Sequence, residues 1–365
     1  MPRSPRFEDA LTDDLRFILE NALSAPSGDN LQEMRWTVRG NTLELIRQSE
    51  EDIMDAISGS RASWISIGAI VENAVIAASV RGYRVAVAYT SDAARPACVA
   101  SLALASDASI VPDPLAGALA TRVTNRKPYR RAPLRAEERD ALLGAGAAAL
   151  LADRQSIVTL ARAVAVYDRF LFSTRDLHDK FFMLINWTKR ADARRRRGLY
   201  FPTLEAPPLS RPALWLLGQW GVMRVGILLG LHRGIAFMQG HIYRRAAAYG
   251  AVLVSGDTSA DWADAGRRVE RVWLTATAAG LSLQPLTGTL FLAFGIDGEL
   301  CRRMFSPAER ERVRAARGVI THAFGAPEGS AVAFLFRVGR AAPPSARTSR
   351  VALADCVDLD TREAS

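Results

Sequence analysis

Two long apolar stretches with the same internal spacing dominate the hydrophobic pattern of the chain. GAIVENAVIAASVRGYRV begins at Gly68, and GRRVERVWLTATAAGLSL begins at Gly266. In both, a second glycine follows 14 positions after the first, and valine and glutamate (Glu72 and Glu270) occupy the third and fourth positions. Because neither stretch shows a polar face between its glycines, each predicts a helix buried on most sides. The second glycine lies where a left-handed helix cap is common.

Shorter apolar runs around these helices predict strands. RVAVAYT and ACVASLALA follow the first helix, GTLFLAFGI and AVAFLFRVGRA follow the second, and AVLVS (Ala251–Ser255) precedes the second. Such runs, rich in β-branched and aromatic residues, are typical of strands. A further helix, Leu15–Leu23, leads through a polar loop into the strand-like RWTV. The pattern predicts an α+β fold made of two copies of one unit.

The two predicted copies are unequal in length. Residues 1–110 form the first half and residues 111–365 the second, joined through SDASIVPDPLAG (residues 106–117). The second half contains a long helical insertion at about residues 156–249. Two such halves packed together would be a covalent version of a symmetric dimer. The alternative is a chance similarity between two apolar helices.

One segment, Pro212–Met238, resembles a membrane span. Arg224 interrupts it, and neither apolar half reaches the roughly 18 to 20 residues that a span requires. We therefore expect a buried or groove-covering pair of helices and no transmembrane segment. A role at a membrane surface is the less favoured alternative.

Composition and charge narrow the class of protein. Apolar residues make up 49% and charged residues 23%, an ordinary globular mixture. The three cysteines are far apart and predict neither a disulfide framework nor a metal site, so a reducing cytoplasm is expected. The N-terminus lacks the apolar core of a signal peptide. The net charge of +9 suits an anionic partner, and without interleaved aromatic residues or a known motif we expect no nucleic acid.

Two polar segments carry candidate chemistry. SAPSGDNLQ, Ser24–Gln32, holds more hydrogen-bonding groups than a turn requires; its side chains either bond their own backbone or face a ligand. In ATRVTNRKPYRR, Arg122, Thr124 and Arg126 alternate, so an extended strand would place them on one face as a phosphate clamp. The alternative for the second segment is a solvated basic strand.

With these segments the sequence resembles the FMN-dependent nitroreductase family, in particular its single-chain members with two nitroreductase-like halves. The loop at Ser24 with RWTV is similar to that family's A-P-S-x-x-N-x-Q-P-W-R-F, although Gln-Glu-Met stands here for Gln-Pro-Trp. The R-x-S/T-x-R/K pattern at Arg122, the repeated G-x-x-x-E helix ending in GLSLQPL, and the tail RVGRAAPPSARTSRVAL are the other matches.

The resemblance implies one FMN site shared between the halves. The phosphate would be held by Arg122, Thr124, Arg126 and Arg350, with Arg347 in reserve. The ring would lie beside Gln284, Pro285 and Leu286, which would offer backbone groups to its reactive nitrogen. The first half would contribute Pro26, Ser27, Gly28 and Asn30, and Gln239 and Arg244 could reach the pyrimidine edge. Because the flavin carries the redox step in this family, no catalytic side chain is implied.

The resemblance further implies an FMN oxidoreductase that moves electrons from NAD(P)H to a small nitro, quinone or related acceptor. We expect one FMN per chain, because the first copy opens with PRSPRFEDA instead of the clamp and the second has GAGAAALLADRQ instead of the polar loop. The expected assembly is an intrachain pseudo-dimer, which is compatible with a monomer. The alternatives are a low-turnover protein that stores FMN under the insertion as a lid, and a scaffold that has lost its flavin.

Overall fold

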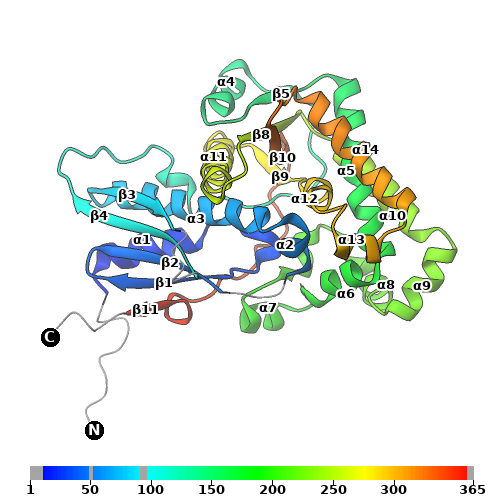
Figure 1. Ribbon diagram of the computed structural model, residues 1–365, viewed down its shortest axis with the longest axis horizontal. Coiled ribbons are helices and arrows are strands. Elements are labelled where there is room, and N and C mark those ends of the chain that lie inside the picture. The colour runs from blue at the N-terminus through cyan, green and yellow to red at the C-terminus, as the bar shows by residue number, and fades with distance from the viewer. Residues whose placement is uncertain (1–10, 49–51, 91–96, 360–365) are drawn as a thin grey trace, which may run out of the picture.

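Two mainly antiparallel sheets, each with its own helices, form the framework of the molecule (Figure 1). The computed structural model describes residues 11–48, 52–90 and 97–359. The first sheet has the strand order β11-β1-β2-β4-β3 and the second the order β5-β8-β10-β9. Their bounds are β1 Met34–Arg39, β2 Thr42–Arg47, β3 Tyr83–Tyr89, β4 Cys98–Ser106, β5 Ala149–Leu151, β8 Ala248–Ser255, β9 Ser282–Pro285, β10 Ser330–Gly339 and β11 Val357–Leu359.

The two sheets follow the same path through the chain. In each, the first two strands along the chain pair with one another, a long helix follows, and the last two strands return in the order fourth, third. All of these pairings are antiparallel in both sheets. A short helix precedes each sheet, α1 (Asp13–Leu23) and α4 (Ala136–Gly144). The topology thus repeats where the sequence repeats.

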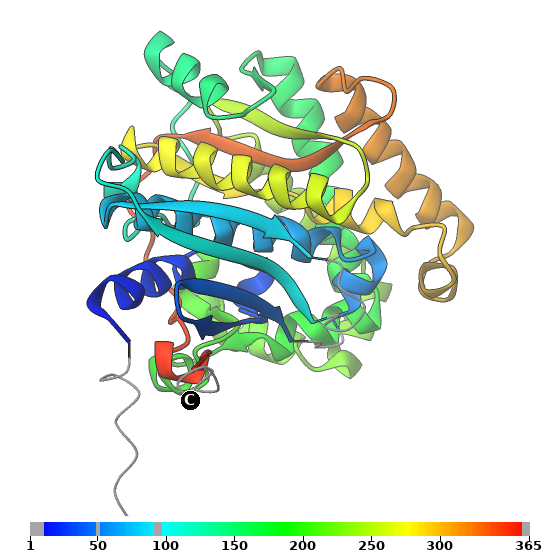
Figure 2. The ribbon, with the colours of Figure 1, turned by 60° about the vertical axis from the view of Figure 1, so that its left-hand side comes forward.

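The repeated long helices, α3 (Arg61–Val80) and α11 (Ser259–Ala278), lie side by side between the sheets (Figure 2). Each begins seven residues before its first glycine, so the prediction that glycine pairs bracket the helices is wrong at the N-terminal end. Instead the first glycines are the contact points. A Cβ on Gly68 would lie 1.8 Å from the carbonyl oxygen of Ala263, and a Cβ on Gly266 would lie 2.2 Å from that of Ile65. Only glycine permits backbones to approach so closely.

The second glycines do have the expected capping role. Gly82 and Gly280 follow the two helices with φ of 73° and 68°, the left-handed conformation of a helix end.

The second half is enlarged by two groups of helices. Between β5 and β8 lie α5 (Arg154–Ser173), α6 (Arg175–Met183), α7 (Lys189–Arg195), α8 (Arg211–Leu217), α9 (Trp220–Leu228) and α10 (Leu231–Tyr243), with the short parallel pair β6 (Ile185–Asn186) and β7 (Leu199–Tyr200). The corresponding connection in the first half is a turn at Gly40 between β1 and β2. The helices α5 to α10 occupy the range in which the sequence predicts an insertion, about residues 156–249, and the division of the chain into halves stays a prediction.

The second group lies between β9 and β10 and comprises α12 (Gly288–Phe294), α13 (Glu299–Met304) and α14 (Pro307–Ala323). The prediction that GTLFLAFGI is a strand is wrong, because it forms α12. Its buried residues Thr289, Leu290, Leu292 and Ala293 follow a helical spacing, and a short apolar run does not distinguish strand from helix.

The C-terminal segment ties the halves together. After β10 the chain leaves the second sheet, and β11 joins the first sheet as a parallel partner of β1, with Trp36 opposite Val357. The first half contributes α2 (Ile53–Ser58) to the junction, where Ile57 packs in one apolar cluster with Leu292 and Ile296 of the second half.

The apolar segment 212–238 forms parts of α8, α9 and α10, and it is only partly buried. Met223, Gly226 and Ala236 face the protein, whereas Leu228, Leu229 and several neighbours are exposed, which corrects the expectation of a buried pair. Among the described residues, α3 is long and apolar enough to span a membrane but is mostly buried. The pair α9 and α10 passes the same test only together, with an 85° bend between them.

Candidate functional site

A cavity of about 570 Å³ lies where the two halves meet. Its walls come from the loop after α1, the segment 119–126, the end of β9, the tail at 346–350, and helices of the insertion. This volume is in the range of cavities that bind cofactors and drug-sized ligands. Of the residues that the resemblance implies for FMN, twelve line it: Pro26, Ser27, Gly28, Asn30, Arg122, Thr124, Arg126, Gln284, Pro285, Leu286, Arg347 and Arg350.

The loop 24–32 is held in an unusual backbone conformation. Asp29, Asn30 and Gln32 have φ of 47°, 58° and 53°, which L-residues other than Asn and Asp rarely adopt. The Ser27 hydroxyl accepts from the Gln32 backbone N–H at 3.2 Å. The Asn30 amide donates to the carbonyl oxygens of Gly198 and Ser349, both at 3.1 Å. Much of the polar content of this loop therefore fixes its path against the insertion and the tail.

Three arginines converge at one end of the cavity. Arg122 Nη2 and Arg350 Nη2 both donate to the carbonyl oxygen of Ser24, at 2.6 and 3.2 Å. Arg347 lies close by and donates to the carbonyls of Ala120 and Thr121. The Nη1 atom of Arg350 is buried and has no hydrogen-bond partner among the described residues. A buried cationic donor without a partner is costly, so its presence at a cavity wall favours an anionic ligand.

The electrostatics of this cluster point the same way. Burial, then the positive charge of Arg122, and also that of Arg347, lower the pKa of Arg350 to about 9. The facing carboxylate is Glu270, whose Oε1 lies 3.1 Å from Arg122 Nε. Burial raises the pKa of Glu270 to about 7 against the opposing effect of Arg122. The cluster therefore contains three guanidinium groups and one carboxylate, Glu270, whose negative charge is reduced. Its net charge is positive.

The predicted strand at Arg122–Arg126 is irregular, with one isolated bridge from Thr124 to Leu283. Thr124 and Arg126 nevertheless reach the cavity wall. Arg126 Nη1 donates to the carbonyl oxygen of Thr203, at 3.1 Å, which links the segment to the insertion. Burial is the main effect that lowers the pKa of Arg126.

The wall at β9 is less open than the resemblance implies. Gln284 Oε1 accepts from Arg337 Nε at 2.8 Å, and the Leu286 N–H donates to the Leu335 carbonyl, also at 2.8 Å. Pro285 has no N–H. The backbone N–H expected from this stretch is therefore already engaged at Leu286.

Gln239 and Arg244 do not line the cavity. Tyr243 does, from the last turn of α10. Gln239 lies four residues earlier on the helix, about 6 Å further along its axis, which moves it away from the cavity.

The structure adds a buried carboxylate that the sequence analysis missed. Asp168 on α5 lines the cavity, and its Oδ1 accepts from the Tyr243 hydroxyl at 3.2 Å. Burial raises the pKa of Asp168 to about 7. The signal for it was a single acid within the otherwise apolar run VAVYD of α5.

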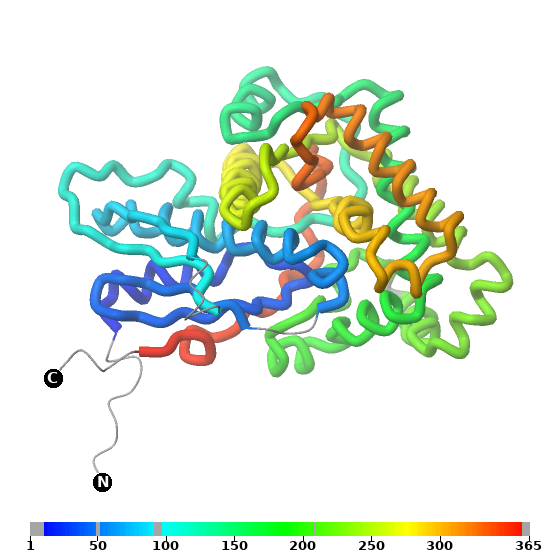
Figure 3. Tube along the Cα trace, viewed as in Figure 1, coloured from blue at the N-terminus to red at the C-terminus, as the bar shows by residue number. Residues whose placement is uncertain are grey.

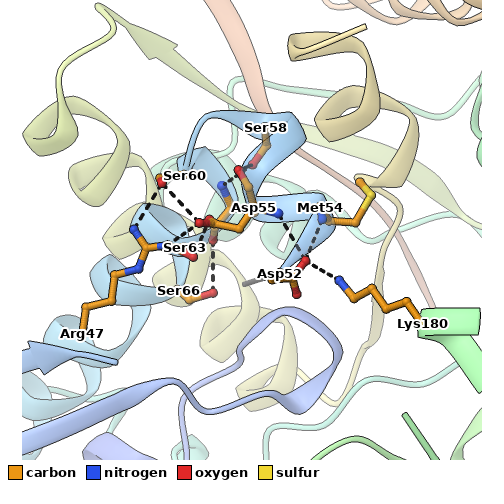
Figure 4. Close-up of polar contacts among 10 residues, drawn as sticks. Arg47, Asp52, Met54, Asp55, Ser58, Ser60, Ser63, Ser66 and Lys180 are labelled. Atoms are coloured by element: carbon orange, nitrogen blue, oxygen red, sulfur yellow. Dashed lines mark hydrogen bonds and ion pairs between the residues drawn. The ribbon is translucent and has the colours of Figure 1, made fainter. Parts of the chain in front are cut away.

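Polar contacts around α2 hold the opposite wall in place (Figure 4). Asp52 caps α2 by accepting from the Met54 N–H at 2.6 Å, and it also pairs with Lys180 of α6. Asp55 accepts from the Ser63 hydroxyl at 2.6 Å and pairs with Arg47. Because Lys180 belongs to the insertion, this network attaches the insertion to the first half.

Fold and site together define a mixed α+β protein with an arginine-lined cavity between two topologically similar sheets. A comparison with protein families finds none that matches the chain. The chain is 27% identical over 290 residues to the uncharacterized protein MT1398 of Mycobacterium tuberculosis. That match covers 76% of this chain and 39% of the relative, so the chain spans about two fifths of that protein's length. A solved structure, the nitroreductase-like family protein from Bacillus cereus, matches 70% of this chain and 100% of its own, with 10% identity and a TM-score of 0.35.

Proposed function

We propose that the chain binds one FMN in the cavity between its halves and acts as a nitroreductase-like oxidoreductase. The observation that carries this proposal is the convergence of Arg122, Arg347 and Arg350 at one end of the cavity, with a donor on Arg350 that has no partner within the described part of the chain. Guanidinium groups bind phosphate through two parallel hydrogen bonds, and the phosphate charge would offset the mutual repulsion of the three arginines. The sequence resemblance supplies the identity of the cofactor.

We further propose that the chain is an intrachain pseudo-dimer with unequal halves, residues 1–110 and 111–365. The support is the shared strand order and the reciprocal glycine contacts, Gly68 with Ala263 and Gly266 with Ile65, as a two-fold axis requires. One FMN per chain follows from the sequence, because each half supplies a different part of the site. The opening of the first copy, PRSPRFEDA, lies entirely outside the described residues, so this count stays a prediction.

When bound, FMN would take a hydride from NADH or NADPH and pass electrons to a small nitro, quinone or related acceptor. The chain's own residues would bind FMN, orient it and protect it from solvent. The arginine cluster would hold the phosphate, and the loop 24–32, with three residues at positive φ, would form a rigid wall. Asp168, hydrogen-bonded to Tyr243, is a carboxyl that can hold a proton near neutral pH at the cavity surface.

A specific observation keeps storage of FMN as the second candidate function. Part of the cavity wall comes from the insertion, through Tyr167, Asp168, Lys180, Thr203 and Tyr243. Walls of this origin would restrict the access of a nicotinamide while leaving the binding of FMN intact.

The visible spectrum of the purified chain tests these proposals. We expect a flavin spectrum, and prompt bleaching when NADH or NADPH is added without oxygen. A flavin that binds but does not bleach would favour storage. Both proposals fail if no flavin co-purifies and added FMN does not raise the melting temperature, since a ligand of the folded state must stabilise it. That outcome would leave a scaffold without flavin.

A further inference from the structure

The exposed apolar side chains of the insertion gather on three consecutive helices. Leu228 and Leu229 are 87% and 82% exposed at the bend between α9 and α10. On α10, Leu231, Phe237 and Met238 are also exposed; Leu231 and Met238, seven residues apart, share one helix face, and Phe237 lies beside it. Val225 on α9 and Trp215 and Leu216 on α8 extend the surface. We call this surface, α8 to α10, the apolar tip.

The shape of the tip distinguishes it from a groove. The axes of α9 and α10 meet at 85°, and the bend carries the two most exposed leucines of the pair of helices. Figures 1 and 3 show α8 and α9 at the edge of the molecule, with the chain turning back toward α10. A projecting apolar bend suits a partner that can deform around it, as a lipid bilayer does.

The charged residues of the segment that contains the tip are all basic. Residues 206–256 contain five arginines and no aspartate or glutamate. Arg211, Arg224 and Arg233 are exposed among the apolar side chains of the tip. Arginine between exposed apolar residues, without acids, is the composition of segments that lie in the interface of an anionic membrane.

A second set of arginines stands beside the tip. Burial and then the positive charges of Arg312 and Arg233 lower the pKa of Arg169, which places the three guanidiniums near one another. Glu309 is the acidic group that acts on Arg169 from α14. Three arginines and one glutamate leave an excess of positive charge around Arg233, a residue of the tip.

From this juxtaposition we propose that the apolar tip docks on an anionic phospholipid bilayer. Leu228, Leu229 and Phe237 enter the boundary between headgroups and acyl chains, and Arg224 and Arg233 bind lipid phosphates. Both helices lie in the plane of the interface, because neither is long enough to cross the bilayer. The proposal is independent of the flavin, since none of these five residues lines the cavity.

Co-sedimentation of the full chain with lipid vesicles tests the proposal. We expect binding to vesicles of phosphatidylglycerol mixed with phosphatidylcholine, much weaker binding to phosphatidylcholine alone, and weakening by salt. The double variant Leu228→Ala/Leu229→Ala should lower the affinity for anionic vesicles about 10- to 100-fold. The double variant Arg224→Glu/Arg233→Glu should lower it by a similar factor, about 10- to 100-fold, and remove most of the salt dependence.

Matched controls separate the tip from general surface effects. Val111→Ala removes an equally exposed apolar side chain (82%) from the loop after β4, and Arg131→Glu reverses an exposed charge outside the tip. Both should bind vesicles as the unaltered chain does. All substituted leucines are exposed, so the variants should keep the melting temperature of the parent.

Two results would overturn the proposal. One is a monomeric chain that binds neither type of vesicle. The other is a chain that does not bind vesicles but forms a dimer in analytical ultracentrifugation, and whose dimer is lost in Leu228→Ala/Leu229→Ala. The tip would then be the contact with a second copy.

Discussion

At the scale of single residues, the cavity depends on charged groups that are buried with incomplete partners. Arg350 has an unpartnered Nη1 and lies beside two other arginines, and Glu270 and Asp168 are carboxyls whose pKa values burial raises to about 7. Such groups reduce the stability of a protein unless a ligand compensates them. Substitutions at these positions therefore report on ligand binding and on stability separately.

Arg350→Met should weaken FMN binding without destabilising the protein. An apolar side chain of similar length removes a buried, repelled charge, so the melting temperature of the flavin-free chain should stay constant or rise. The affinity for FMN should fall roughly 10- to 150-fold, the value of a charge-assisted hydrogen bond of about 1.5 to 3 kcal/mol. Fluorescence titration measures the affinities of the parent and the variant for FMN and for riboflavin. Riboflavin, which has no phosphate, serves as the control and should bind both proteins equally. Equal FMN affinities would remove Arg350 from the phosphate site.

Asp168→Asn should change how stability depends on pH. The folded-state pKa of about 7 lies above the unfolded value of about 3.9, so the folded chain holds the proton more tightly between these values. The free energy of unfolding contributed by Asp168 is complete below about pH 4 and is lost as the pH rises to about 7, on the order of 4 kcal/mol in all. Urea unfolding at about pH 4.5, 6 and 8 should show this loss in the parent and a smaller one in the variant. Parallel curves for the two proteins would contradict the prediction.

At the scale of elements, the crossing of α3 and α11 determines how the halves meet. The glycines at the crossing allow backbone contact, and Glu72 on α3 reinforces it by pairing with Arg267 at 2.6 Å and Arg271 at 2.8 Å on α11. Glu270, at the same place in the repeat, instead lies behind the cavity wall and pairs with Arg122, which lines the cavity. One repeated residue thus serves the interface in one copy and the candidate site in the other.

Gly68→Ala should destabilise the protein strongly, although alanine is the better helix former. The added Cβ would lie 1.8 Å from a backbone oxygen of Ala263, and α3 and α11 must separate to accommodate it. We expect a loss of about 3 kcal/mol or more in chemical unfolding. Gly318→Ala, within α14 and with no neighbour within 4 Å, is the matched control and should gain about 0.5 to 1 kcal/mol. A stable Gly68→Ala variant would show that the helices do not cross there in solution.

At the scale of the whole molecule, the site belongs to neither half alone. The loop 24–32 and α2 come from the first half, and the arginines come from the second half and its tail, which continues into β11 of the first sheet. The insertion joins both, through Lys180 to Asp52 and through the Asn30 amide to Gly198. Each half therefore depends on the other: the site needs residues from both, and the first sheet needs β11 from the C-terminal tail.

The flavin-free chain should unfold in one transition. Separate unfolding of one half would expose the interface between α3 and α11 and remove β11 from its sheet. Because this destabilises the other half, we expect the two halves to unfold together. Tryptophan fluorescence and far-UV circular dichroism should give coincident urea curves. Trp36 reports on the first core and Trp273 on the second, and two separated midpoints would contradict the prediction.

The sequence by itself determined the α+β class and the repeated pair of apolar helices, and through the family resemblance it named twelve of the residues that line the cavity. The helices follow from local information, because apolar periodicity marks buried helices and strands, and clusters of Gly, Pro, Asn and Arg mark loops and charged segments. Only the tertiary structure decided that Gly68 and Gly266 are points of backbone contact, that GTLFLAFGI is helical, that Asp168 and Tyr243 reach the cavity, and that Gln239 does not. Each of these depends on which surfaces meet across long separations in the chain, and spacing along one segment contains no information about the backbone or side chain that packs against it.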